Sequence, residues 1–467
     1  MLIGYILIFS YILLLSFGCG PLLQKRFDGE TSRKFIHIML FLVWVLIDRF
    51  LRGTVHQIII PVSFIFLNLL SYRFQLCKSI ERTEGNHFGT VYFAVAITVI
   101  MTISYFFPAF YLPSGIAVMC LTFGDGFAAL IGYHFKSRKI ADHKSLLGFV
   151  SAAAASALAL FGFNALYEVG LSAMEILTLG LLTAILELVD HGLDNFTIVF
   201  GAFFLSFAFL SAPQPRLLLS AVLALVIFLV IFFTGAIDYD GSLCSMAVVF
   251  CFSYFGGAFA LSFLLASYFT VFFISAAKKH LLHRKKEEKP RTAAQILING
   301  GLGTLCVVAY GLTGQTRLLV IGIVSVGGCF VDSLSSDVGV LSRKPPYDPL
   351  RRCTVEPGLS GGMSGLGTLA ALLGAAGIAL ALTVYLHRSP AWLLSITAII
   401  FSQTLVDTLL GSWAQVKYRC PVCGALTERR QHCGQTASPA AGLSWVDNNT
   451  VNLLSSVIVT ALALAVL

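Results

Sequence analysis

The sequence predicts an all-α protein that crosses a membrane about sixteen times, in two halves. Only 12% of its 467 residues are charged and 57% are hydrophobic, with a mean hydropathy of +0.86. Soluble proteins carry about 25% charged residues. Continuous apolar runs such as 217–233, 366–386 and 451–467 are long enough to cross a ~30 Å hydrocarbon core as helices. Their continuity excludes the alternating pattern of a transmembrane barrel.

Apolar runs place the expected spans along the whole chain, at 1–19, 36–51, 55–71, 89–107, 113–132, 146–165, 171–189, 196–212, 217–234, 243–257, 259–277, 293–313, 317–332, 361–385, 392–412 and 448–467. A boundary near Arg216 divides them into halves 1–215 and 216–467. The first run is followed, not preceded, by basic residues, so we expect a retained span rather than a cleaved signal peptide. The first 20 residues contain no arginine, which favours a prokaryotic plasma membrane over an organelle.

Most lysines and arginines fall in every second loop, including 20–35, 133–145, 278–292 and 333–360. The positive-inside rule predicts that these loops are cytoplasmic. The net charge of +8 is then explained by topology and by contact with anionic lipid, and no nucleic-acid partner is expected. The 11 cysteines lie mostly within apolar spans and do not suggest a disulfide framework.

The N-terminal half has its chemically suggestive residues in or next to the basic loops on this side: Arg33, Lys34, His37, Gly124, Asp125, Gly126, Lys139, His143, Lys144, Asp194 and Asn195. A charge such as Asp125 inside an apolar span costs about 2.5–3.5 kcal/mol on insertion scales. A carboxylate near several lysines suits Mg²⁺ with a nucleotide triphosphate. Asp125, His143 and Lys144 are the catalytic candidates, and the others are candidates for nucleotide and phosphate binding. Two structural alternatives are an Asp125–Lys144 pair and simple anchoring of a helix end by Arg33 and Lys34.

These motifs resemble the dolichol kinase and phytol kinase family over about residues 20–205. The resemblance rests on Arg33-Lys34…His37, residues 89–92 and 124–132, Lys144-Ser145…Gly148 and Glu187…Asp194-Asn195. It implies phosphorylation of a membrane isoprenoid alcohol by CTP or another nucleoside triphosphate with Mg²⁺. That family is distantly similar to CDP-diacylglycerol synthases, so cytidylyl transfer is an alternative.

The C-terminal half carries a second set of candidates: Asp332, Asp337, Arg343, Lys344, Gly361, Gly362, Asp407, Gln415, Asn449 and Asn452. Asp332 and Asp337 are expected to hold Mg²⁺ and to act in catalysis, with the others binding phosphate. Five residues on a helix turn about 140°, so these two carboxylates share a face only if the helix breaks, for which Ser335 and Ser336 are suited. Gly361 and Gly365 fit either a phosphate-binding loop or close helix packing.

Cys420, Cys423, His432 and Cys433 have the spacing of metal ligands. Adjacent His and Cys ligands are geometrically awkward. A structural Zn²⁺ site and reduced free thiols both stay open.

The C-terminal half is similar to the membrane family that includes phytyl-phosphate kinase. The similarity rests on Arg291-Thr292…Asn299-Gly300, Asp332…Gly339, Gly361-Gly362…Gly367-Thr368, Asp407…Gln415 and Asn448-Asn449…Asn452. Asp337 stands where Glu is expected in that family. Together the two resemblances imply a bifunctional kinase in the bilayer that converts an isoprenoid alcohol to its monophosphate and then to the diphosphate. A lipid or substrate transporter, or a C-terminal half with only a structural or regulatory role, are the alternatives.

Overall fold

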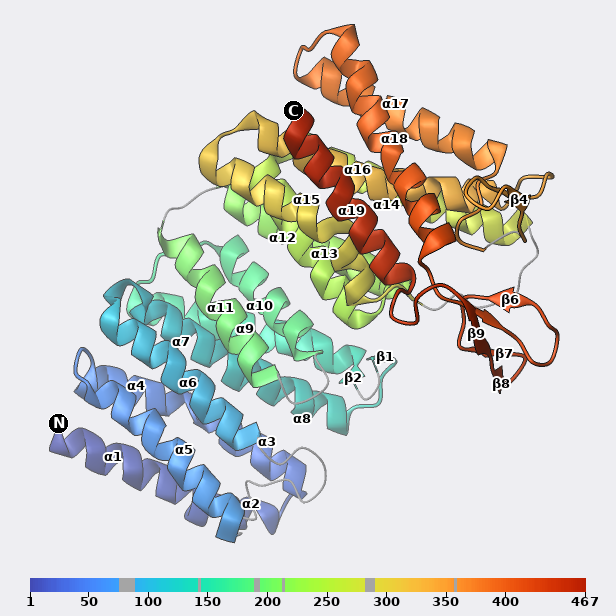
Figure 1. Cartoon of the computed structure of the whole chain (residues 1–467). Coiled ribbons are helices and arrows are strands. Elements are labelled where there is room, and N and C mark those ends of the chain that lie inside the picture. The colour runs from blue at the N-terminus through green and yellow to red at the C-terminus, as the bar shows by residue number, and fades with distance from the viewer. Residues whose placement is uncertain (75–88, 142–143, 189–193, 212–214, 282–289, 357–358) are drawn as a thin grey trace. The chain divides into compact units, whose positions relative to one another are not determined.

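The computed structural model describes residues 1–74, 89–141, 144–188, 194–211, 215–281, 290–356 and 359–467 (Figure 1). Helices dominate both of its compact units, Met1–Leu225 and Val226–Leu467, which confirms the all-α class. The boundary lies within helix α12, Pro215–Thr234, about ten residues after the predicted position at Arg216.

Unit 1 contains α1 Leu2–Leu13, α2 Gly20–Gln24, α3 Gly29–Met39, α4 Phe41–Leu51, α5 His56–Phe74, α6 Gly89–Phe106, α7 Tyr111–Met119, α8 Gly126–His134, α9 Leu146–Tyr167, α10 Ala173–Glu187 and α11 Asp194–Ser211. Wide π-helical turns, Leu14–Cys19 and Cys120–Asp125, interrupt two of the longer helices, and a 3₁₀ turn, Pro108–Phe110, precedes α7. A two-stranded hairpin, β1 Lys139–Ala141 with β2 Lys144–Ser145, connects α8 to α9.

Unit 2 contains α13 Tyr239–Cys251, a π turn Phe252–Gly256, α14 Gly257–Leu281, α15 Ala293–Thr313, α16 Thr316–Gly339, α17 Gly365–Tyr385, α18 Pro390–Trp413 and α19 Asn448–Val466. A hairpin of β3 Tyr347–Asp348 and β4 Cys353–Thr354 connects α16 to α17. Between α18 and α19 lie the short strands β5 Lys417–Arg419, β6 Leu426–Thr427, β7 Gln431–His432, β8 Gln435–Thr436 and β9 Ser438–Ala441, and they pair as β6-β5-β9 and β7-β8.

Within the described residues, eleven helices are long and apolar enough to cross a membrane, fewer than the sixteen expected. Several predicted spans form shorter helices instead. Helix α4 has 11 residues and α10 has 15, so they extend only about 16 and 22 Å at 1.5 Å per residue. Hydropathy detected these apolar runs, but it could not detect where each helix ends.

One of the eleven, Tyr239–Lys278, is 40 residues long and consists of two helices that run in opposite directions. The start of α13 lies beside the start of α15, because Asp238 N–H donates to the Arg291 carbonyl at 3.0 Å. The π turn after α13 reaches the other end of α15, where the Phe255 ring packs on Gly311.

Helix α14 returns to the first side. Its last turns bind Asp337 through Ser275 and Lys278, at 2.5 and 2.6 Å. Asp337 lies near the end of α16, which runs back along α15 after a short connection. The reversal occurs at Gly257, whose φ of +78° is strained for any residue with a side chain.

Candidate functional site

A buried ion pair joins the Arg33–His37 motif of unit 1 to the motif at residues 124–132. The Lys34 ammonium on α3 donates to both oxygens of Asp125, at 2.7 and 2.6 Å, and both side chains are only 6% exposed. His37, one turn further along α3, places Nε2 3.3 Å from Asp125 Oδ2. The sequence predicted these three residues as site candidates. The partner expected for Asp125 in the structural alternative, Lys144, binds another carboxylate.

Local structure explains why these side chains meet. Asp28 caps α3 by accepting from Thr31 N–H at 3.1 Å, which fixes the start of the helix and directs Lys34 and His37 along one face. Asp125 ends the π turn Cys120–Asp125. Such turns are frequent at functional sites because they rotate a side chain out of the regular helical register.

A second ion pair lies beside the first. Lys144 on β2 contacts Glu187 at the end of α10, whose side chain is 4% exposed. Lys34, Asp125, Lys144 and Glu187 line a cavity of about 230 Å³, together with Glu30, Ala128, Ala129, Gly132, Tyr133, Ser145, Gly148 and Phe149. The cavity thus collects two ammonium groups, Lys34 and Lys144, and three carboxylates, Glu30, Asp125 and Glu187. Glu187 was noted in the resemblance but was not chosen as a site residue.

Other candidates of unit 1 have different surroundings. Arg33 bonds with Glu30 at 2.5 Å, on the helical turn beside the cavity. Gly124 and Gly126 allow close packing, because a methyl group on Gly124 would lie 2.6 Å from Ser156 Oγ and one on Gly126 would overlap Ile38. These glycines therefore serve helix contact rather than ligand approach.

The remaining unit 1 candidates are less central. Lys139 is exposed on β1, and Asn195 is buried, donating to the Gly89 carbonyl at 3.1 Å. Asp194 begins α11, but its side chain lies outside the described residues, as does His143.

In unit 2, Asp332 lies on α16 and Asp407 on α18, and these two helices pack together. One turn earlier on each helix, a methyl group on Gly328 would lie 3.0 Å from Gln403 Cβ, so the helices are in close contact there. The Ser455 hydroxyl on α19 donates to Asp407 at 3.4 Å. In the described part of the chain, neither carboxylate forms an ion pair with lysine or arginine.

The expected pairing of Asp332 with Asp337 is wrong. Helix α16 continues from Thr316 to Gly339 without a break at Ser335 or Ser336, so the two carboxylates keep their separation of about 140°. Asp337 points to α14, where it accepts from Ser275 and Lys278. Its contacts are those of a residue that joins two helices.

The glycine pair Gly361 and Gly362 lies in a loop, before α17 begins at Gly365. Gly361 has a φ of +93°, and a methyl group there would lie 2.6 Å from Ser412 Cα at the end of α18. Packing between helices through Gly361 and Gly365 is therefore excluded, since only Gly365 is helical. Ser364 caps α17 by accepting from Gly367 N–H at 3.1 Å.

The remaining unit 2 candidates are dispersed. Arg343 and Lys344 are exposed, and Asn449 and Asn452 lie partly buried on the first turn of α19. Gln415 is 1% exposed, and its side-chain carbonyl has no hydrogen-bond partner among the residues whose structure is described.

The same local arrangement occurs in both units, which the sequence analysis missed. In unit 1, a methyl group on Gly132 would lie 3.1 Å from Ser145 Oγ, and one on Gly148 would lie 3.0 Å from the Ala128 carbonyl. In unit 2, a methyl group on Gly339 would lie 3.0 Å from Ser364 Oγ, and one on Gly367 would lie 2.7 Å from the Ser335 carbonyl.

A shared sequence pattern accompanies these contacts. Phe123, Asp125 and Gly132 have the spacing of Phe330, Asp332 and Gly339, and Ser145-x-Leu147-Gly148 matches Ser364-x-Leu366-Gly367. In each unit a hairpin follows the aspartate-bearing helix, and the serine caps the next helix. Asp332 thus occupies in unit 2 the place of Asp125 in unit 1. Aligning the two halves with each other would have found this signal.

A buried carboxylate that sequence reasoning did not single out organises the loop after α16. Asp348 is fully buried and accepts from the Ser412 hydroxyl at 2.7 Å and from the backbone N–H of Leu350 and Arg351 at 3.0 Å. Burial alone would raise the pKa of Asp348, but these hydrogen bonds and nearby Lys417 outweigh it and lower the pKa. The loop is therefore fixed to the end of α18.

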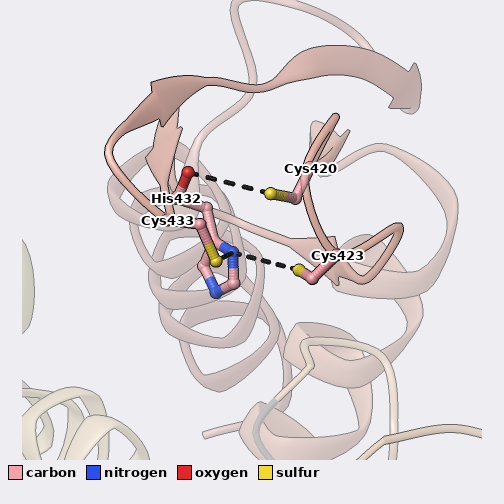
Figure 2. Close-up of side chains that lie close together, drawn as sticks. All are labelled: Cys420, Cys423, His432 and Cys433. Atoms are coloured by element: carbon pink, nitrogen blue, oxygen red, sulfur yellow. Dashed lines mark hydrogen bonds between the residues drawn. The ribbon is translucent and has the colours of Figure 1, made fainter.

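The four candidate zinc ligands converge in the segment between α18 and α19 (Figure 2). Their ligand atoms all lie within 4.8 Å of one another. His432 Nδ1 is 3.5 Å from Cys423 Sγ and 3.3 Å from Cys433 Sγ. Hydrogen bonds, foremost from the backbone of Cys423, lower the pKa of the buried Cys420 thiol to about 6. These four side chains could hold a metal ion.

The fold and its polar clusters define a polytopic helical membrane protein whose charged side chains gather at helix ends. The chain belongs to the family described as integral membrane protein DUF92, whose model matches residues 222–460. It is 27% identical over 275 residues to Protein PGR of Arabidopsis thaliana, covering 52% of this chain and 94% of that protein.

A second relative is the uncharacterized membrane protein MJ0933 of Methanocaldococcus jannaschii. It is 30% identical over 164 residues, which cover 34% of this chain and 67% of the relative. No solved structure matches the chain. The family match falls almost entirely in unit 2 and shows an integral membrane domain, whereas the kinase assignments of both units stay predictions.

Proposed function

We propose that this protein is a membrane-embedded phosphotransferase that phosphorylates an isoprenoid alcohol in unit 1 and the resulting monophosphate in unit 2. The observation that carries the proposal is the unit 1 cavity, which is lined by the buried ion pair Lys34–Asp125 and the partly buried ion pair Lys144–Glu187. Its polar lining suits phosphate, while the surrounding bilayer dissolves the long apolar tail of the substrate.

The donor set fits Mg²⁺ with a nucleotide triphosphate, either CTP or another. Carboxylates and phosphate oxygens are the ligands that Mg²⁺ prefers, and lysines take up remaining phosphate charge. Asp125 and Glu187 would hold the ion, which would supply charge neutralisation. Lys34 and Lys144 are placed to exchange their carboxylate contacts for phosphate oxygens.

In the first reaction, the alcohol oxygen bonds to the γ-phosphorus of the nucleoside triphosphate. The bond between that phosphorus and the bridging oxygen breaks, and the nucleoside diphosphate leaves. We assign Asp125 as the group that accepts the alcohol proton, because the π turn before α8 places this carboxylate in the cavity wall. Positioning and charge stabilisation account for most catalysis in reactions of this kind.

The second phosphorylation is assigned to unit 2 on the repeated arrangement. Asp332 has the position of Asp125 in the shared sequence pattern, and Asp407 lies on α18, the second helix after the hairpin, as Glu187 lies on α10 in unit 1. A monophosphate is already ionised near pH 7, so this site needs charge neutralisation more than a base. By the positive-inside rule we place both sites at the cytoplasmic face.

The test is incubation of the purified protein in detergent with Mg²⁺ and CTP, using geranylgeraniol and, separately, its monophosphate. Diphosphate from both substrates, with CDP as the nucleotide product, supports the proposal. Release of pyrophosphate instead would support cytidylyl transfer. Turnover of neither substrate with CTP, ATP, GTP or UTP would overturn the proposal and favour a transporter.

Single substitutions separate the two sites. Asp125→Asn should abolish phosphorylation of the alcohol and leave that of the monophosphate, and Asp332→Asn should do the reverse, each by at least about 100-fold. Asp240→Asn is the matched control, because this carboxylate is exposed at the start of α13 and takes no part in either cluster. Equal loss of both reactions in Asp332→Asn would argue against two sites.

A further inference from the structure

We propose that Cys420, Cys423, His432 and Cys433 bind one structural Zn²⁺, and that this ion keeps the segment Lys417–Ala441 folded against the turn at Ser360. The inference is independent of the proposed phosphotransfer. It rests on the convergence of four ligand atoms within 4.8 Å of one another (Figure 2).

The donor set selects the metal and its role. Three thiolates and one imidazole form a soft, four-coordinate set that is typical of tetrahedral zinc. Four protein ligands leave no open position for water or substrate, so the site is structural rather than catalytic.

Backbone conformation removes the difficulty of adjacent His432 and Cys433 ligands. Cys433 has a left-handed φ of +49° and Gly434 follows at +76°, so the chain turns back and Cys433 Sγ approaches the ring of its neighbour. A non-glycine residue adopts this region only with backbone strain. The zinc ligation that we propose would compensate for that strain.

The first ligand pair forms a tight turn of its own. Gly424 N–H donates to the Cys420 carbonyl at 3.0 Å, and Gly424 has a φ of +73°. Val422 N–H donates to Cys420 Sγ at 3.4 Å. These two bonds close the turn that brings the sulfurs of Cys420 and Cys423 within 4.8 Å of each other.

The segment has little else to hold it together. Its strands are two to four residues long, and its buried apolar cluster within the described chain consists of Val416, Tyr418 and Ala437. A core of this size does not stabilise a small module by itself, whereas a structural Zn²⁺ contributes folding free energy directly.

Zinc binding would also order the loop before α17. Lys417 Nζ donates to the Ser360 carbonyl at 2.9 Å, and Ser360 N–H donates to Glu428 at 2.6 Å. These two hydrogen bonds join the metal-bound segment to the turn at Ser360.

The first experiment measures zinc in the full-length protein, purified in detergent without chelator, by plasma mass spectrometry. We expect about one Zn²⁺ per chain in the wild type and less than about a fifth of that in Cys423→Ser. Cys353→Ser is the matched control, because Cys353 is an exposed free thiol outside the cluster, and it should retain the wild-type content. Equal zinc in Cys423→Ser and Cys353→Ser would overturn the proposal.

A second experiment does not depend on a variant that folds. The wild-type protein is treated with chelator and reductant and then titrated with Co²⁺, which should give the absorption bands of a tetrahedral thiolate complex and be displaced by Zn²⁺. Hydrogen exchange should rise after chelation at the backbone amides of Gly424 and Ser360, while those of α9 stay unchanged. The absence of both the Co²⁺ bands and the exchange response would overturn the proposal.

Discussion

Lys34 donates to both carboxylate oxygens of Asp125, at 2.7 and 2.6 Å, although 91 residues separate them in the chain. Both side chains are 6% exposed. The pair connects α3 to the π turn before α8, and it brings the charged end of α3 to the cavity. Because both charges are buried, removing either one leaves the other buried without its opposite charge, which costs stability.

Removing one partner should be strongly destabilising. Lys34→Met keeps the length of the side chain but leaves Asp125 buried without its cation, which should cost about 3–5 kcal/mol. We expect a clearly lower thermal midpoint in detergent, measured by intrinsic fluorescence. Lys139→Met, on the exposed strand β1, should leave the midpoint unchanged.

The double variant Lys34→Met with Asp125→Leu tests the reason for that loss. Replacing both charges removes the uncompensated carboxylate, so the double variant should be more stable than Lys34→Met alone. If the stability lost in the double variant equals the sum of the losses in the two single variants, the result would contradict the pairing.

The glycines that repeat between the units should not tolerate a methyl group. In Gly367→Ala the new Cβ would lie 2.7 Å from the Ser335 carbonyl, so α16 and α17 must separate and the thermal midpoint should fall. Gly377→Ala on the same helix has no neighbour within 4 Å and should raise stability by about 0.5–1 kcal/mol, as expected for Gly→Ala in a helix. A similar change in both variants would show that the close approach at Gly367 is not required.

Substitutions in unit 2 should distinguish Asp407 from Asp337 as the residue that acts with Asp332. If unit 2 phosphorylates the monophosphate, Asp407→Asn should lower that reaction about as strongly as Asp332→Asn, by at least about 100-fold. Asp337→Asn should mainly lower the thermal midpoint, because it loses the charge that binds Lys278 on α14. Full activity in Asp407→Asn with none in Asp337→Asn would restore the original pairing.

The contribution of Asp348 to stability should depend on pH. Its pKa is lowered in the folded protein from an ordinary value of 3.8, so its stabilising effect is present above that value and is lost as the pH falls through the folded pKa. Asp348→Asn should lower the free energy of unfolding by about 1–3 kcal/mol near pH 7, because it weakens the hydrogen bonds from Ser412 and the backbone.

The measurement compares the thermal midpoints of the wild type and Asp348→Asn between pH 7 and pH 3. The difference should be constant above about pH 5 and should shrink below it. Asp240→Asn, an exposed carboxylate, serves as the control for general acid effects. A difference between wild type and Asp348→Asn that does not change over this range would contradict the assignment.

Several features of this protein were determined by the sequence alone. Its apolar runs specified a helical membrane protein, because backbone groups in lipid must be satisfied within each segment. Lys34, His37 and Asp125 were found as site candidates because charge within or beside an apolar run is costly and is seldom kept without a reason. The spacing of Cys420 and Cys423 likewise identified them as candidate metal ligands, because they lie three residues apart in the sequence.

Partner choice and helix ends were decided only by the tertiary structure. The sequence offered Lys144 as the partner of Asp125 and Asp337 as the partner of Asp332, since both are close along the chain. In the folded protein Asp125 pairs with Lys34 on α3, and the continuous helix α16 turns Asp337 away from Asp332 to Lys278 on α14. Hydropathy records how apolar a segment is, whereas contacts between distant helices depend on side-chain shape and close approach, which a linear pattern does not contain.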